Sequence, residues 1–123
     1  MKTGLRVFVV EDEMMVALLA EAVLLDLGHL PVGPALRLED ALAMVRDEEI
    51  DVAMLDVNLG EVKSFPIADL LRDRGIPFFF ATGYGIEGLS APYRDELVVD
   101  KPYFMADINR ALTTVMARAT PSN

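Results

Sequence analysis

The chain has 123 residues, 53% hydrophobic and 25% charged, so it fits one folded domain and is not globally disordered. It contains no cysteine, which excludes disulfides, thiolate metal sites and cysteine nucleophiles. Its 20 acidic and 11 basic residues give a net charge of −9 without an evident basic patch. This charge disfavours nucleic-acid binding and favours protein or metal-cation partners, with simple solubility as the alternative.

No segment of the sequence is typical of export or of a membrane span. The apolar run 7–10 is too short for the hydrophobic part of a signal peptide. No run approaches the ~20 apolar residues that cross a bilayer. With cysteine absent as well, the pattern favours a cytoplasmic protein without membrane contact.

The first half of the chain alternates strand-like and helical patterns. Gly28 is a stop signal for the first helix, and the second helix has apolar residues at the i, i+4 and i+7 positions. Asp56 interrupts an apolar strand, where a carboxylate is expensive to bury unless it is paired or binds a metal. The expected elements are a strand over 5–10, a helix over 13–27, a short strand over 30–33, a helix over 38–47 and a strand over 52–57.

The second half continues the alternation, with one weak helix. Ser64 is placed to cap a helix that has Pro66 in its first turn. Three glycines and a proline in 83–92 make a poor helix, so we expect a short or irregular one. The expected elements are a turn over 58–60, a helix over 64–74, a strand over 76–82, the irregular helix over 86–94, a strand over 97–99, a helix over 103–119 and a frayed tail over 120–123.

This alternation predicts an α/β fold with a doubly wound, five-stranded parallel sheet, in a single domain over 1–123 with its core in 5–119. The strands of such a sheet end at one edge, where open α/β sheets bind ligands. Carboxylates, a hydroxyl and a lysine at that edge indicate a magnesium-assisted phosphoryl-transfer site. The residues at the four strand ends are Glu11, Asp12, Asp56, Thr82, Asp100 and Lys101.

Four motifs at these strand ends resemble the receiver domain of bacterial two-component response regulators. The resemblance covers 5 to about 119 and implies the strand order 2-1-3-4-5. The segment 80–84 looks like the Phe-Ala-Thr-Gly-x-Tyr branch, whose members are often stand-alone receivers. The motifs are Val9-Val10-Glu11-Asp12-Glu13, Asp56-Val57-Asn58-Leu59-Gly60, Ala81-Thr82-Gly83 and Asp100-Lys101-Pro102.

The resemblance implies that Asp56 is the phosphoacceptor, which takes a phosphoryl group from a phosphohistidine on a sensor kinase. Taken alone, Asp56 is also compatible with capping of the following turn. The resemblance further implies that Asp12 binds Mg²⁺ (or Mn²⁺) directly and that Glu11 acts through water, with Asp56 and the backbone carbonyl of Asn58 as further ligands. Most relatives carry Asp at the position of Glu11, and this departure bears on the water network there.

Thr82 and Lys101 complete the chemistry that the resemblance implies. The Thr82 hydroxyl is expected to donate to a phosphoryl oxygen, and the Lys101 ammonium to stabilise the phosphoryl charge. Alone, Thr82 is also compatible with an ordinary β-branched residue ending a strand. Gly83 leaves room for the phosphoryl group, and Pro102 resembles a family proline whose preceding peptide bond is often cis.

Three further positions are expected to modulate the site. Asn58 and Tyr84 stand where receivers tune the rate of phosphoryl hydrolysis, and Tyr84 either screens the site from water or lies exposed on a glycine-rich loop. Val98 stands where many receivers carry an aromatic residue that swings inward. The usual Thr–aromatic switch therefore cannot operate, and we expect the stretch 83–88 to order on phosphorylation instead.

The helix over 13–27 has few charges and a wide apolar stripe. Receivers commonly dock their first helix on the four-helix domain of the kinase, so we expect the spare face to do so here. The alternative is a core helix with some exposed leucines. His29 follows Gly28, and we expect it in a turn without a metal-binding role.

The leading hypothesis is a single-domain response regulator, which catalyses only its own phosphotransfer and dephosphorylation and is not an enzyme in the ordinary sense. Its output is expected through proteins: as a phosphate sink for the kinase, as a relay to a histidine phosphotransferase, or by binding a downstream target. One alternative is a degenerate receiver that acts as a binding module, which the complete acidic–Asp–Thr–Lys set disfavours. The other is a haloacid-dehalogenase-like phosphohydrolase, which would need a second Asp at the position of Asn58.

Overall fold

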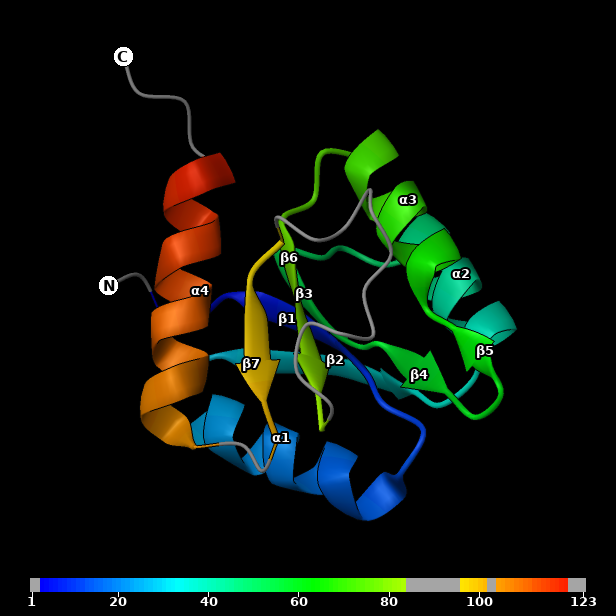
Figure 1. Cartoon of the computed structure of the whole chain (residues 1–123). Coiled ribbons are helices and arrows are strands. Elements are labelled where there is room, and N and C mark those ends of the chain that lie inside the picture. The colour runs from blue at the N-terminus through cyan, green and yellow to red at the C-terminus, as the bar shows by residue number, and fades with distance from the viewer. Residues whose placement is uncertain (1–2, 84–95, 102–103, 120–123) are drawn as a thin grey trace.

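A computed structural model describes residues 3–83, 96–101 and 104–119. In this part of the chain, five parallel strands form one sheet in the order β2-β1-β3-β6-β7 (Figure 1). This order confirms the predicted 2-1-3-4-5 topology. The sheet strands are β1 (Arg6–Val10), β2 (Leu30–Ala35), β3 (Val52–Asp56), β6 (Phe78–Thr82) and β7 (Val98–Asp100).

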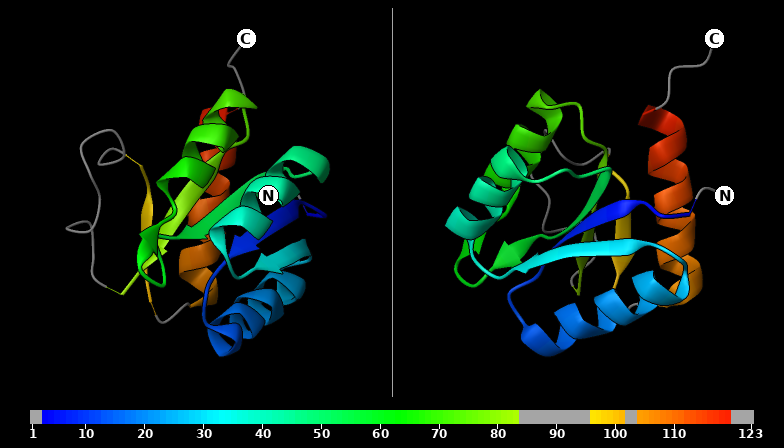
Figure 2. Two further views of the ribbon diagram at one scale, coloured as in Figure 1. Left: turned by 90° about the vertical axis from the view of Figure 1, so that its right-hand side faces the viewer. Right: turned by 180° about the vertical axis from the view of Figure 1, so that it is seen from behind.

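Helices cover both faces of this sheet. Figure 2 shows α2 and α3 on one side of the strands, and α1 and α4 on the other. The crossovers place the helices there because a parallel neighbour can be reached only by returning over a face of the sheet. The helices are α1 (Met14–Asp26), α2 (Leu38–Asp47), α3 (Phe65–Asp73) and α4 (Met105–Ala119).

The apolar side chains form two cores, one on each face of the sheet. Alternate residues of a strand point to opposite faces, so Phe8 packs with α2 and α3 whereas Val7 and Val9 pack with α1 and α4. On the α2–α3 side the Phe80 ring meets Phe65 and Phe78 edge to face, with centroids 5.9 and 5.6 Å apart. Because both faces are covered, the central strands β1, β3 and β6 are apolar except at one end residue of each, as is typical of parallel sheets.

Two local predictions differ from the structure. The second strand runs to Ala35, past the expected end, because β2 pairs along β1 as far as Val10. Its Gly33–Pro34 peptide bond is cis. The expected turn over 58–60 is a hairpin of β4 (Asn58–Leu59) and β5 (Val62–Lys63).

The structure also corrects two side-chain predictions. Ser64 precedes α3 but its hydroxyl caps no backbone N–H; its backbone is not extended, and the oxygen is buried without a hydrogen-bond partner in the described part of the chain. His29 lies just after the turn formed by residues 27–28, not in it, and it is buried. Its Nδ1 accepts a hydrogen bond from the Leu5 amide at 3.3 Å.

Some predictions fall on parts of the chain that lie outside the described residues. These are the irregular helix over 86–94 and its ordering, the tail over 120–123, the position of Tyr84 and the peptide bond before Pro102. Within the described ranges, none of the helices combines the length and apolar character that crossing a bilayer requires.

Candidate functional site

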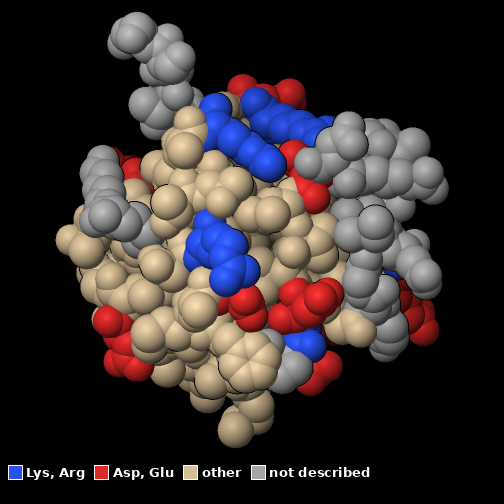
Figure 3. Space-filling model, turned by 60° about the vertical axis from the view of Figure 1, so that its left-hand side comes forward, with Lys and Arg blue, Asp and Glu red and all other residues tan. Residues whose placement is uncertain are grey.

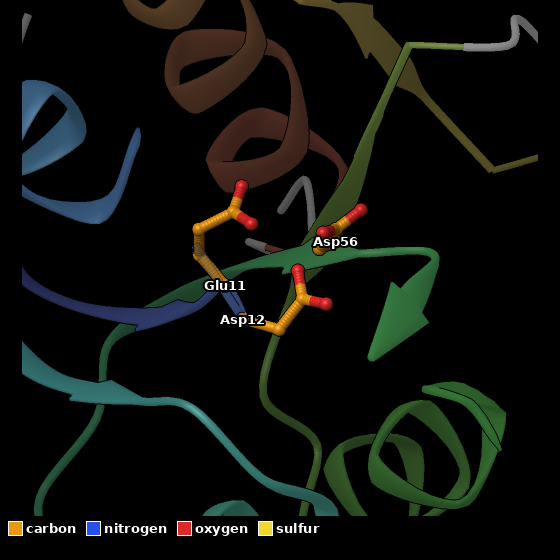
Figure 4. Close-up of side chains that lie close together, drawn as sticks. All are labelled: Glu11, Asp12 and Asp56. Carbon is orange, nitrogen blue, oxygen red and sulfur yellow. The ribbon is translucent and has the colours of Figure 1, made fainter. Parts of the chain in front are cut away.

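The carboxyl ends of β1 and β3 bring three acidic side chains together. Glu11 and Asp12 follow β1, and Asp56 is the last residue of β3. One carboxylate oxygen from each of the three lies within 4.8 Å of the others. Figure 4 shows the group gathered at the strand ends, with β4 beside it. Their placement follows from the parallel register of the strands, in which Val10 is aligned with Leu55.

Lys101 lies between two of these carboxylates. Its Nζ donates to Glu11 Oε1 at 2.5 Å and lies 3.1 Å from Asp56 Oδ2. Burial alone lowers the pKa of Lys101, but the hydrogen bond to Glu11 and the charge of Asp56 outweigh it and raise the pKa above its ordinary value. The ammonium is therefore held in its charged form at the site.

Glu11 is fully buried and both of its carboxylate oxygens have partners. Oε1 accepts from Lys101, and Oε2 accepts from the Glu13 backbone N–H at 3.1 Å. The residue therefore serves as an anchor for Lys101. The extra methylene of Glu relative to Asp is consistent with this reach across to the lysine.

Asp56 is 7% exposed and lies next to like charge. Burial, and then the neighbouring Glu11 carboxylate, raise the pKa of Asp56 to about 7, against the opposing effect of Lys101. With all groups ionised, three carboxylates face one ammonium, an excess of negative charge that a divalent cation would offset.

Asp12 is exposed at the rim of the site. Its Oδ2 accepts a hydrogen bond from the Gly60 backbone N–H at 2.8 Å. Burial would raise the pKa of Asp12, but the hydrogen bond from Gly60 and those with Glu11 and Asp56 together lower it. Asp12 is therefore the carboxylate of the group most readily available to a cation.

Thr82 ends β6 directly beside these groups. It is 1% exposed, and its backbone carbonyl accepts from the Lys101 N–H at 3.0 Å. A hollow of about 380 Å³ opens among Asp12, Asp56, Thr82 and Lys101, large enough for a phosphoryl group and a hydrated cation. Asn58 and Gly83 line the same hollow.

Solved structures with this fold include two of one close relative. SdrG from Sphingomonas melonis Fr1 is 40% identical, with 94% of this chain and 99% of that chain covered and a TM-score of 0.84. The BeF3-activated conformation of SdrG, from a source named as Pseudomonas melonis Fr1, matches with the same identity and coverage and a TM-score of 0.80.

The receiver domain of the PhyR response regulator from Erythrobacter litoralis has a TM-score of 0.76 at 24% identity, over 98% of this chain and 97% of that chain. No protein-family model matches the chain, and no curated protein does. This chain belongs to the response-regulator receiver family. It is thus a response-regulator domain of two-component signalling.

The receiver fold brings most of the sequence-predicted site residues together. Seven of them line one hollow or contact a residue that does: Glu11, Asp12, Asp56, Asn58, Thr82, Gly83 and Lys101. Val98 does not join them; it is half-buried and packs against the core on the α2–α3 side. Tyr84 and Pro102 lie outside the described residues.

Sequence reasoning missed two contacts of this receiver site. The first is the Gly60 amide on Asp12, and the second is a hydrogen bond from Lys63 Nζ to Asn58 Oδ1 at 2.5 Å. Both come from the β4–β5 hairpin. The glycine at position 60 was the sequence signal of this turn. In the structure Gly60 takes a φ of +65°, which favours glycine, at the two-residue turn of the hairpin.

The donor set fits a hard divalent cation. Asp12 and Asp56 offer carboxylate oxygens to the hollow, and Asn58 at its edge has a backbone carbonyl. Mg²⁺ and Mn²⁺ prefer oxygen ligands of this kind. Glu11 faces Lys101 with one oxygen and the Glu13 amide with the other, so its carboxylate supports the site from behind.

Proposed function

We propose that this receiver accepts a phosphoryl group on Asp56 from a sensor histidine kinase, with Mg²⁺ or Mn²⁺ bound, and loses it by self-catalysed hydrolysis. One observation carries the proposal. Lys101 Nζ lies 3.1 Å from Asp56 Oδ2, in a hollow that Asp12 and Thr82 also line. A nucleophile, a fixed positive charge, a hydroxyl and a cation-binding carboxylate are the parts that phosphoryl transfer needs.

In the proposed transfer, an Asp56 carboxylate oxygen attacks the phosphorus, the P–O bond forms and the P–N bond to the kinase histidine breaks. Asp56 must be ionised to attack. Lys101 favours that ionised form and would contact the phosphoryl oxygens in the transition state. Glu11 positions the Lys101 ammonium, and the Thr82 hydroxyl would donate to a phosphoryl oxygen.

Asp12, Asp56 and the Asn58 carbonyl would hold the divalent cation, which supplies neutralisation of phosphoryl charge when it is bound. Gly83 leaves space at the mouth of the hollow, because none of the described residues lies within 4 Å of where its side chain would begin. Hydrolysis then needs a water in line with the aspartyl phosphate. We propose that the side chains of Asn58 and Tyr84 tune its rate.

The similarity to SdrG supports this proposal. That protein has been solved in a BeF3-activated conformation, and beryllofluoride is an analogue of a phosphoryl group on a carboxylate. The corresponding complex of this chain would place the same reagent on Asp56.

The kinase is proposed to dock on the outer face of α1. The described surface has large apolar side chains there that nothing covers, and Met15 is 78% exposed. Figure 3 brings the α4 side of the molecule forward and shows uncharged residues around a few basic and acidic side chains. The exposed apolar residues of α1 are Met14, Met15, Leu18, Leu19 and Leu25.

We further propose a cytoplasmic single receiver domain over 1–123 whose output runs through proteins. It would act as a phosphate sink, as a relay to a histidine phosphotransferase, or by binding a target in its phosphorylated form. Neither nucleic acid nor membrane is a proposed partner, which agrees with the net charge of −9.

The test is the intact mass of the protein after incubation with acetyl phosphate and Mg²⁺. We expect a gain of one phosphoryl group, lost in Asp56→Asn and when the metal is chelated. If no gain is seen and beryllofluoride with Mg²⁺ leaves the melting temperature unchanged, the proposal fails. The chain would then be a receiver that binds partners without phosphorylation.

A further inference from the structure

The β4–β5 hairpin directly follows the phosphoacceptor position and is fixed at its base. Asn58 pairs with Lys63, and Leu59 pairs with Val62. Below these pairs the Ser64 N–H donates to the Val57 carbonyl at 2.9 Å. Leu59 is 5% exposed and belongs to the core on the α2–α3 side, so the hairpin is anchored to the fold.

The turn of the hairpin reaches a residue of the candidate cation site. The Gly60 N–H donates to Asp12 Oδ2 at 2.8 Å, across 48 residues of sequence. Gly60 has a φ of +65°, and within the described ranges no atom lies within 4 Å of the position that a side chain would take. The Gly60 amide contacts Oδ2 and not Oδ1, and it fixes the orientation of the Asp12 carboxylate.

A side-chain hydrogen bond joins the two strands of the hairpin at Asn58, a second residue of the site. Lys63 Nζ donates to Asn58 Oδ1 at 2.5 Å, between the two members of one strand pair. Asn58 is half-buried beside the hollow, and its backbone carbonyl is the proposed third ligand. The Asn58 side chain is bonded to Lys63, and the Asn58 backbone is paired with Lys63 in the hairpin. Together these contacts restrict rotation of the backbone that bears the carbonyl.

We infer that the β4–β5 hairpin positions the ligands of the divalent cation, with the Gly60 amide orienting Asp12 and Lys63 orienting Asn58. Lys63 is thus a positioning residue that itself makes no contact with the cation. The inference rests on the proposed function, because it concerns the same cation site.

The charge of Lys63 makes the inference testable by its sign. An ammonium near a cation site repels the cation, so by electrostatics alone its removal would tighten Mg²⁺ binding. A positioning role predicts the opposite, because the Asn58 carbonyl loses its fixed orientation. Loss of such supporting contacts typically weakens metal binding by about 10- to 100-fold.

The experiment is a Mg²⁺ titration of the full chain, followed by amide chemical shifts. We expect Lys63→Met to bind Mg²⁺ about tenfold more weakly than the wild type, at the low end because the contact is exposed. Lys63→Arg keeps a donor and should retain most of the affinity. Arg37→Met is the matched control: Arg37 lines a hollow that Asp12 and the hairpin also line, so the variant removes the same charge near the site and leaves the Lys63–Asn58 hydrogen bond in place.

A second readout is hydrogen exchange at the Gly60 amide. Mg²⁺ should slow this exchange in the wild type, and less so in Lys63→Met. Equal or tighter Mg²⁺ binding by Lys63→Met overturns the inference and leaves the cation site standing, provided that Asp12→Asn abolishes binding. Absence of any Mg²⁺-dependent shift in the wild type would instead overturn the cation site, and the inference with it.

Discussion

Strand β3 passes through two different environments within five residues. Val52–Leu55 are buried among apolar side chains, alternately in the core of either face. Asp56 is buried almost as deeply but faces Glu11 and Lys101. The apolar part of the strand stabilises the fold, whereas the last residue is a titratable group kept in an unfavourable environment. One strand therefore combines apolar residues that belong to both cores with a buried carboxylate at the candidate site.

The largest expected effect comes from disrupting the apolar core against which β3 packs, at Phe80 of the neighbouring strand β6, which is aligned with Leu55. Phe80→Ala removes a fully buried ring that packs against Phe65 and Phe78. We expect the free energy of unfolding to fall by about 3–5 kcal/mol, measured by urea denaturation. Val62→Ala, at a 47% exposed position, should change it by no more than about 0.5 kcal/mol. A loss below about 1 kcal/mol at Phe80 would contradict the described core.

A smaller effect on stability is expected at Asp56, the polar end of β3, where replacement should stabilise the protein. The folded pKa of Asp56 is raised to about 7, so between about pH 4 and pH 7 the folded state keeps a proton that the unfolded state releases. The contribution of Asp56 to the free energy of unfolding therefore falls as the pH rises through this window, and it is constant above pH 7.

Asp56→Asn removes this dependence. With a chelator present, we expect the variant to match the wild type near pH 4 and to be more stable by on the order of 2 kcal/mol at pH 8. Thermal unfolding at several pH values measures the difference. Saturating Mg²⁺ should shrink it, because a bound cation favours the ionised carboxylate. A wild type that is the more stable at pH 8 without metal would show that Asp56 is not held in an unfavourable environment.

The smallest effect on stability is expected on the outer face of α1, which lies outside both environments. Met15→Glu should change the free energy of unfolding by less than about 0.5 kcal/mol, because Met15 is 78% exposed. If the kinase docks there, phosphotransfer from it should slow about tenfold, by the loss of about 1.4 kcal/mol of binding.

Two comparisons isolate docking in that experiment. Phosphorylation by acetyl phosphate should be unchanged in Met15→Glu, since the chemistry of the site is untouched. Thr113→Glu, at an exposed position of α4, adds the same charge elsewhere and should transfer at the wild-type rate. Equal rates for Met15→Glu and the wild type would exclude this face as the docking surface.

The fold was predictable because its periodic signals are strong and agree with one another. Apolar runs such as 52–55 can only be strands or buried helices, and their alternation with amphipathic segments admits few topologies. The acidic and basic site residues were predictable for a related reason. Parallel strands end at one edge, so residues at strand ends are neighbours whatever their separation in sequence.

Other features were not predictable, because they depend on non-local contacts. His29 looked like a turn residue, and it is buried because the Leu5 amide lies against its ring. Ser64 looked like a helix cap, but the chain enters α3 from the hairpin with a backbone that turns its hydroxyl away from that role. Local propensity describes neither case, since the position of each side chain is set by segments elsewhere in the fold.

The sequence by itself determined the class of fold and the identity of the residues at the carboxyl edge, because hydrophobic periodicity and chain direction are properties of the order of residues. The strand order was implied by the resemblance to receivers. Only the tertiary structure decided how those residues are used. It turned Glu11 toward Lys101 and made a hairpin amide the partner of Asp12. Such pairings depend on distances of a few ångströms between distant segments, and these are set when the two cores pack.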